Sequence, residues 1–220
     1  RMNAQVRGIN VAVRNANDGV SMAQTAEGAL SKVSDSLQRM RELTVQARNG
    51  TNGAKDQESL DKEFQELAKE ITRVIGGADF NGKKILSGDA GDIAFQVGAN
   101  TTDNDVITIS TTDLSGDATI TAVTSGKIMG ADSTTEATAD ELKDVIDNID
   151  IALDTVNSQR AVLGASQNRF ESVIANLQVA SENTAAARSR ITDADFASET
   201  ANLSRSQILQ QAGTAMVAQA

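Results

Sequence analysis

The residues best suited to bind a partner lie in the stretch Gln38–Leu43, which reads QRMREL. On a helix, Arg39 and Leu43 are four residues apart and share one face, and Gln46 follows one turn later. The Arg39 guanidinium offers five donors in a planar fork, and Leu43 would supply an apolar anchor beside it. Met40 belongs to a buried stripe, so Arg39 and Leu43 need not be buried. From spacing alone, an ordinary solvated helix face with one stray Leu is the simpler interpretation.

The chain lacks most residue types that catalytic and metal sites use. It contains no Cys, His, Pro, Trp or Tyr. Without Cys and His, most zinc sites, most nucleophile–base pairs and haem ligation through His cannot be formed. Asp103 and Asp105 imitate part of a metal loop, but the regular ligand spacing and terminal Glu of a calcium-binding loop are missing, which favours a solvated turn. We therefore predict no enzyme, no metal site and no cofactor.

The charge balance bears on possible partners. Thirty acidic residues against twenty basic ones give a formal net charge of −10. Binding to nucleic acid needs a basic footprint, so we predict no nucleic-acid partner. No apolar run is long enough to cross a membrane, so we predict no membrane partner either.

One apolar stripe organises residues 1–48. Its members alternate in steps of four and three, shift once at Ala26 and then resume: Met2, Val6, Ile9, Val13, Ala16, Val20, Ala23, Leu30, Val33, Leu37 and Met40. Residues 15–19 are poor helix formers, yet Ala16 and Val20 keep the phase across them, so burial is expected to outweigh propensity. The pattern predicts one continuous helix of about 70 Å, which is too long for a compact globule.

Two further helical regions follow the same spacing. The Gly- and Asn-rich residues 49–53 predict a break, after which a second helix runs over about 54–75, antiparallel to the first. The stripe returns at Leu142 and continues to about Ile191. A new capping signal at Thr192 and Asp195 predicts a last helix that runs to the end of the chain.

Between these helices the chain is rich in strand signals. Short strands are predicted at residues 84–86, 93–97, 106–111 and 119–123. The polar residues 98–105 predict the turn of a hairpin, and residues 116–139 predict an exposed loop with a little local structure. The fold class predicted is mainly α: an elongated bundle of long heptad-patterned helices with a small antiparallel β-hairpin region at one end.

Several ordered motifs make the chain resemble bacterial flagellin, the filament subunit of the flagellum. They are residues 14–19 (RNANDG), 23–30 (AQTAEGAL), 38–43 (QRMREL), 80–86 (FNGKKIL), 163–170 (LGASQNRF), 187–191 (ARSRI) and 206–213 (SQILQQAG). The resemblance covers about residues 1–111 and 140–220. It implies a helical rod domain with the inner-tube termini of the family largely removed, so we expect a fragment.

The resemblance also implies a division of the chain. Residues 1–112 would be the N-terminal half of the rod domain, two helices followed by the hairpin region. Residues 113–139 would be a reduced variable region, 140–192 the long C-terminal helix of the rod, and 193–220 the start of the inner-tube helix.

By resemblance, the function is structural and extracellular. The partners implied are other flagellin subunits, a flagellar export chaperone and cap, and the vertebrate innate immune receptor Toll-like receptor 5. Ile149, Leu153 and Arg169 match family positions implicated in recognition or packing. The receptor-contact positions expected are Gln38, Arg39, Arg41, Glu42, Leu43, Gln46, Glu63, Ile149, Leu153 and Arg169. Two alternatives remain open: a hook-associated protein with a similar helical rod, or another coiled-coil adaptor.

Overall fold

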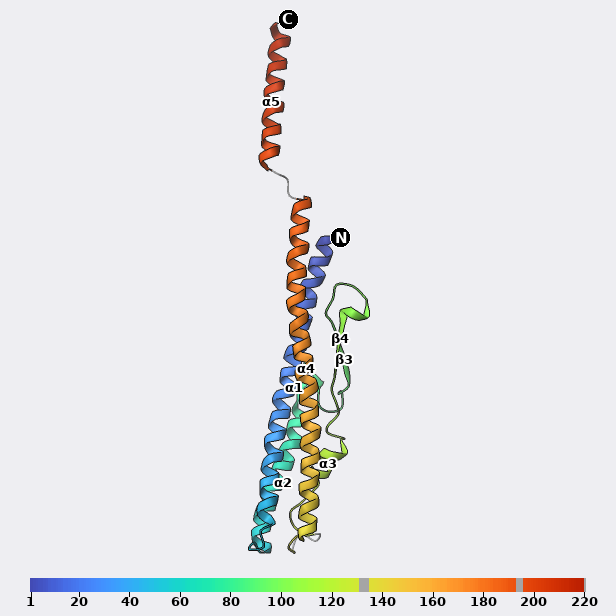
Figure 1. The fold of residues 1–220 in the computed structure, drawn as a ribbon, viewed down its shortest axis with the longest axis vertical. Helices are drawn as coiled ribbons and strands as arrows, with labels where there is room; N and C mark the ends of the chain where they lie inside the picture. Colours follow the sequence, from blue (N-terminus) through green and yellow to red (C-terminus); the bar gives the residue numbers. More distant parts are fainter. Residues whose placement is uncertain (131–134, 193–195, 220) are drawn as a thin grey trace.

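The structure is a computed structural model that describes residues 1–130, 135–192 and 196–219. Its elements, in chain order, are α1 (Met2–Ala47), α2 (Ala54–Gly77), β1 (Asp79–Phe80), β2 (Lys83–Lys84), β3 (Asp92–Gln96), the 3-10 helix η1 (Asp103–Asp105), β4 (Val106–Ser110), α3 (Ala118–Thr124), α4 (Ala139–Thr192) and α5 (Phe196–Gln219). The predicted mainly helical, elongated bundle is confirmed (Figure 1).

The shaft of the molecule is an antiparallel pair of very long helices. Figure 1 shows α1 and α4 side by side, with α2 packed along the half of the shaft that lies near the α1–α2 turn. The 54 residues of α4 correspond to about 80 Å of helix. The shaft is therefore a three-helix bundle in one half and a helix pair flanked by the β3–β4 hairpin in the other.

The first helix runs without a break through residues 15–19, the segment of poor helix formers. Ala16 is completely buried, and the side-chain amide of Asn17 donates to the Val13 carbonyl at 2.8 Å. Gly19 faces the Phe170 ring of α4 so closely that an ideal Cβ there would lie 2.6 Å from Cζ. The residues that weaken helix propensity are thus used for packing, and burial outweighs their cost.

The core of the bundle is mostly aliphatic, and Phe is its only aromatic residue type because the chain has no Trp or Tyr. It consists of side chains that α1, α2 and α4 bury against one another: Leu30, Val33, Leu37, Met40 and Leu43 of α1, Phe64, Ile71 and Ile75 of α2, and Leu142, Ile149, Val156 and Leu163 of α4. The heptad pattern therefore marked the buried faces of all three helices.

The strands form two antiparallel pairs. β1 pairs with β2 across the two-residue turn Asn81-Gly82, and β3 pairs with β4 in the register Asp92↔Ser110 to Gln96↔Val106. The β3–β4 hairpin lies against the shaft. Asn15 Nδ2 donates to the Gln96 carbonyl at 2.9 Å, and the Phe95 ring meets Phe170 edge-on, with centroids 5.5 Å apart. The predicted hairpin is confirmed.

The strand predicted at residues 119–123 is wrong. These residues form α3, whose N-terminus is capped by Asp117 Oδ1, which accepts from Thr119 N at 2.8 Å. Ile120 and Val123 are three residues apart and both buried, which is helical spacing. The β-branched composition suggested a strand, but the cap and the tertiary packing decide the local structure.

The exposed loop predicted over residues 116–139 is also wrong in part. Besides α3, Ile128 and Met129 are buried. Polar side chains of α2, spaced by four residues along one face, hold backbone groups of this segment. The bonds run from Gln65 Nε2 to the Gly126 carbonyl at 2.9 Å, from Ile128 N to Asp61 Oδ1 at 2.8 Å and from Ala137 N to Gln57 Oε1 at 2.8 Å.

The last helix differs from the others in its surroundings. Every α5 side chain that the structure describes is exposed, including Leu203, Ile208, Leu209 and Met216. The predicted helix is confirmed. Asp195, the second half of the predicted capping signal, lies outside the described residues.

The contact of Gly19 with Phe170 generates a first prediction. Gly19→Ala should lower the free energy of unfolding, because overpacking costs about 1 to 3 kcal/mol and outweighs the gain in helix propensity of about 1 kcal/mol. Chemical denaturation followed by circular dichroism measures the change.

Gly28→Ala in the same helix is the matched control. A Cβ at Gly28 meets no atom within 4 Å, so this substitution should raise stability by about 0.5 to 1 kcal/mol. Equal stabilisation by both substitutions would contradict the close packing at Gly19.

Candidate functional site: a charged face on three helices

Arg39 connects the first two helices. Its Nε donates to Glu63 Oε1 of α2 at 2.7 Å, and its Nη1 donates to Glu42 Oε2, one turn along α1, at 3.0 Å. The pKa of the Arg39 guanidinium is raised above its ordinary value, chiefly by the hydrogen bond to Glu63 and then by that to Glu42. Nearly half of the Arg39 side chain stays exposed, so it is fixed in direction and still accessible.

Arg41 makes the equivalent connection to α4. Its Nε and Nη2 donate to the two carboxylate oxygens of Asp150, at 2.7 and 3.2 Å, in a bidentate pair. The hydrogen bond to Asp150 raises the pKa of the Arg41 guanidinium. Bidentate geometry aligns the guanidinium with the carboxylate, so this pair links α1 to α4 at the edge of their buried seam.

These ion pairs belong to one exposed surface, which we call the arginine face. It consists of Gln38, Arg39, Arg41, Glu42, Val45 and Gln46 of α1, Glu63 of α2 and Asp150 of α4, and part of it is hollowed between Gln38 and Gln46. The structure thus brings six of the ten predicted positions together: Gln38, Arg39, Arg41, Glu42, Gln46 and Glu63.

The expectation that Leu43 is an exposed apolar anchor is wrong. Leu43 is completely buried in the core, because the heptad step after Met40 falls on it. The apolar side chain on the arginine face is Val45, which is 51% exposed. Val45 lies four residues after Arg41 and off the buried stripe, a spacing that could have identified it.

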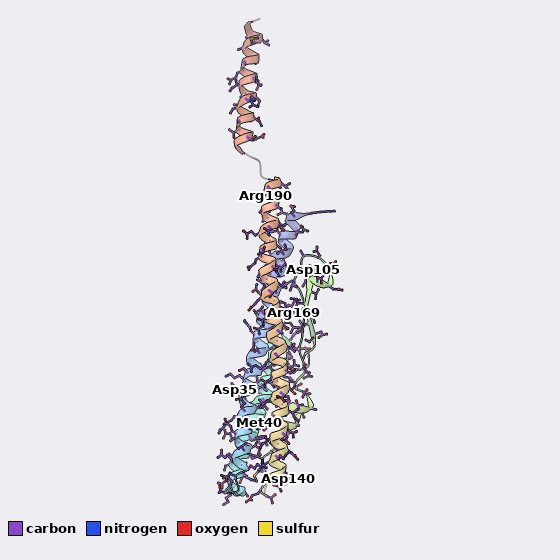
Figure 2. The ribbon with its side chains drawn as sticks, viewed as in Figure 1. Asp35, Met40, Asp105, Asp140, Arg169 and Arg190 are labelled. Carbon is purple, nitrogen blue, oxygen red and sulfur yellow. The ribbon has the colours of Figure 1, made fainter. Side chains whose placement is uncertain are left out.

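The three positions predicted on α4 do not form one site. Ile149 is completely buried and Leu153 is half-buried against the core, so both are packing residues. Arg169 is exposed but lies 19 residues beyond Asp150, which is about 28 Å along a helix. Figure 2 shows Arg169 near the hairpin that carries Asp105, well separated from Met40. Sequence reasoning missed Asp150, although a charge beside the stripe residue Ile149 is typical of interhelical pairs.

Arg169 borders a second hollow, of about 500 Å³, between α4 and the hairpin. Its polar lining comes from Asp103, Asn104 and Asn168. In the neighbouring turn, the Thr102 hydroxyl donates to Asp105, and this hydrogen bond lowers the pKa of that carboxyl. The hollow can accept a small polar group, but it contains no nucleophile and base in contact.

Metal binding and membrane insertion can both be assessed for the described residues. Within residues 1–130, 135–192 and 196–219, no group of three or more acidic side chains is placed to hold a metal ion. In the same part of the chain, no helix is both long and apolar enough to cross a membrane.

Comparison with known protein families gives matches over most of the chain. Residues 1–90 match the family model of the bacterial flagellin N-terminal helical region, and residues 146–220 match that of the C-terminal helical region. A flagellin of Halalkalibacterium halodurans is 44% identical over 220 residues, covering all of this chain and 77% of the relative. This chain belongs to the bacterial flagellin family. Members of this family are structural subunits of the flagellar filament.

Other relatives support the same family assignment. A flagellin of Bacillus subtilis is 39% identical over 244 residues, covering the whole chain and 80% of the relative. A flagellar filament core protein of Treponema maltophilum is 37% identical, covering the whole chain and 78% of the relative. Among solved structures, Bacillus cereus flagellin has a TM-score of 0.59 and 31% identity, over 74% of this chain and 88% of that one.

The hook-associated alternative shares the fold but little sequence. A protein assigned as flagellar hook-associated, from Vibrio parahaemolyticus, has a TM-score of 0.67 over 84% of this flagellin and 92% of its own chain, at 15% identity. The rod architecture is therefore common to both groups of proteins, and sequence identity places this chain with the flagellins.

The bidentate pair on the arginine face generates a second prediction. In a double-mutant cycle, Arg41→Ala and Asp150→Ala should each lower the free energy of unfolding and should couple favourably. The coupling should disappear in about 1 M salt, where the Debye length is about 3 Å. Denaturation curves of the two single variants and the double variant measure it.

Asp154 supplies the matched control, since it lies one turn further along α4 and is exposed. The cycle of Arg41→Ala with Asp154→Ala should show a smaller coupling. Equal coupling in both cycles, or coupling that persists in high salt, would contradict a specific bidentate bridge.

Proposed function

We propose that this flagellin polymerises through its helices into an extracellular filament, and that the arginine face of the free subunit binds Toll-like receptor 5. The exposed apolar side chains of α5 are the observation that supports polymerisation. Leu209, Ala212 and Met216 follow the spacing i, i+3 and i+7 and share one face, and Leu209 and Met216 are two-thirds or more exposed.

The exposure of α5 argues for a partner helix. A lone helix of 24 residues is marginally stable in water, because most helical stability in proteins comes from packing an apolar face. Several large apolar side chains exposed on one helix are typical of an interaction surface, and α5 exposes Leu203, Ile208, Leu209, Met216 and Val217. Other copies of the same chain are the partners that the filament supplies, and an export chaperone and a cap would meet the subunit before and during assembly.

Assembly is tested by placing a charge on the apolar stripe. Carried by the full-length gene, Leu209→Asp should abolish filaments in a strain that lacks its own flagellin but keeps its hook-associated proteins. It should leave the thermal unfolding of the rod unchanged, because Leu209 touches none of the rod's core. Electron microscopy of the cells measures the first effect, and circular dichroism of the purified chain measures the second.

Gln207→Asp is the control, since it adds the same charge on the side of α5 opposite Leu209. Filaments formed by the Leu209→Asp variant, or lost equally in both variants, would oppose the proposal. Failure of the unaltered full-length gene to restore filaments in this strain would also oppose the proposal.

Receptor binding is supported by the geometry of the arginine face. Arg39 is accessible, and two carboxylates hold its guanidinium, so little side-chain entropy would be lost on binding. Val45 adds an exposed apolar contact to the same face, in the hollow that it lines with Arg41 and Glu42. We infer that the same surface packs between neighbouring subunits, so that it would be accessible only in free subunits.

A binding measurement with the purified receptor ectodomain tests this site. Arg39→Ala should weaken binding about tenfold or more, since Arg is typical of binding hot spots. Glu63→Ala should weaken it less, because it frees the guanidinium without removing it. Surface plasmon resonance gives the dissociation constants.

Arg73→Ala is the matched control on α2, because Arg73 also forms a salt bridge with a carboxylate, Glu70, but lies off the arginine face. Binding that falls equally in the Arg39 and Arg73 variants would indicate a general charge effect. Unchanged binding by a folded Arg39→Ala variant would exclude the arginine face as the receptor site.

A further inference from the structure

The chain contains three Asn-Gly pairs, at Asn49-Gly50, Asn52-Gly53 and Asn81-Gly82. An Asn followed by Gly can deamidate without an enzyme. The Gly backbone nitrogen attacks the side-chain carbonyl carbon, a ring closes, and the side-chain nitrogen leaves as ammonia. Water then opens the ring at either carbonyl and gives Asp or isoaspartate. The reaction needs a free Gly N–H, which must lose its proton, and an Asn carboxamide that can reach it.

At Asn52, hydrogen bonds restrain both reacting groups, the carboxamide and the N–H of the following Gly. Its Nδ2 donates to the Gln46 carbonyl at 2.6 Å, at the end of α1. The Gly53 N–H that would have to attack donates instead to Asp56 Oδ2 at 3.2 Å, as part of the cap of α2. Both hydrogen bonds must break before the ring can close.

Asn81 is constrained by its backbone. It has φ of +50° and Gly82 has φ of +79°, the left-handed pair of a tight hairpin turn. The strand residues Phe80 and Lys83 pair on either side of this turn. Ring closure changes the backbone torsions of the Asn, which the paired strands resist.

Asn49 is held by its backbone: its N–H donates to the Gln46 carbonyl at 3.1 Å, and its carbonyl accepts from the Asn52 N–H at 2.9 Å. Its Oδ1 accepts from Thr51 N at 3.4 Å, which turns the carboxamide toward the Asn49–Gly50 peptide. Within the part of the chain that the structure describes, the Gly50 N–H has no hydrogen-bond partner, and Asn49 and Gly50 are both exposed. The attacking nitrogen is therefore unpaired and next to the carboxamide.

We propose that Asn49 is a site of spontaneous deamidation in the folded protein, and that the fold protects Asn52 and Asn81. The product adds a carboxylate next to the C-terminus of α1, one turn from Gln46 on the arginine face. If isoaspartate forms, the backbone of the α1–α2 connection also becomes one carbon longer.

The test is incubation of the folded chain at mildly alkaline pH, followed by peptide mapping with mass spectrometry. Asn49 should deamidate about tenfold faster than Asn52 or more, because Asn52 must first break two hydrogen bonds. In denaturant the three rates should converge. Equal rates in the folded chain, or faster reaction at Asn52 or Asn81, would overturn the proposal.

Two variants sharpen the test. Gly50→Ala should slow deamidation at Asn49, since a Cβ restricts the peptide; it fits the fold, because it meets no atom within 4 Å. Asp56→Ala frees the Gly53 N–H and should speed deamidation at Asn52. An unchanged rate at Asn52 in a variant of normal helicity would overturn the protective role of the cap.

Discussion

The buried seam between α1 and α4 is the constraint on which the rest of the structure depends. Residues 48–138 separate these helices in the chain, yet their stripes meet along the shaft, from Phe170 against Gly19 to the start of α4 beside the α1–α2 turn (Figure 1). Everything else is placed by this pair. α2 packs on one half of it, and the β3–β4 hairpin docks on the other through Asn15 and Phe95.

The arginine face is a consequence of the same seam. Arg39 and Arg41 emerge on either side of the buried Met40, so one points toward α2 and the other toward α4. Their carboxylate partners come from helices that only the folded bundle brings together. The charged face therefore exists only in the folded bundle, although the motif that carries it is continuous in sequence.

Periodicity in the sequence predicted the helices well, because burial repeats at the helical period in Leu30, Val33 and Leu37. The strand predicted at 119–123 failed because Ile120 and Val123 suit either structure, and a local cap with tertiary packing decided between them. Leu43 was misplaced because the stripe was followed only as far as Met40. Asp150 and the bonds from α2 to residues 126–137 depend on distant segments meeting, which spacing along one chain does not report.

The shaft is unevenly packed along its length. Near the α1–α2 turn, α1 buries Leu37, Met40 and Leu43 between two helices. At its N-terminal end it buries Ile9, Ala12 and Ala16, and Met2 and Val6 remain partly exposed. Small side chains packed against one helix and a two-stranded hairpin remove less apolar area from water per turn. Within the shaft, the N-terminus of α1 and the facing part of α4 therefore open before the rest, and amide protection rises toward the three-helix end of the rod.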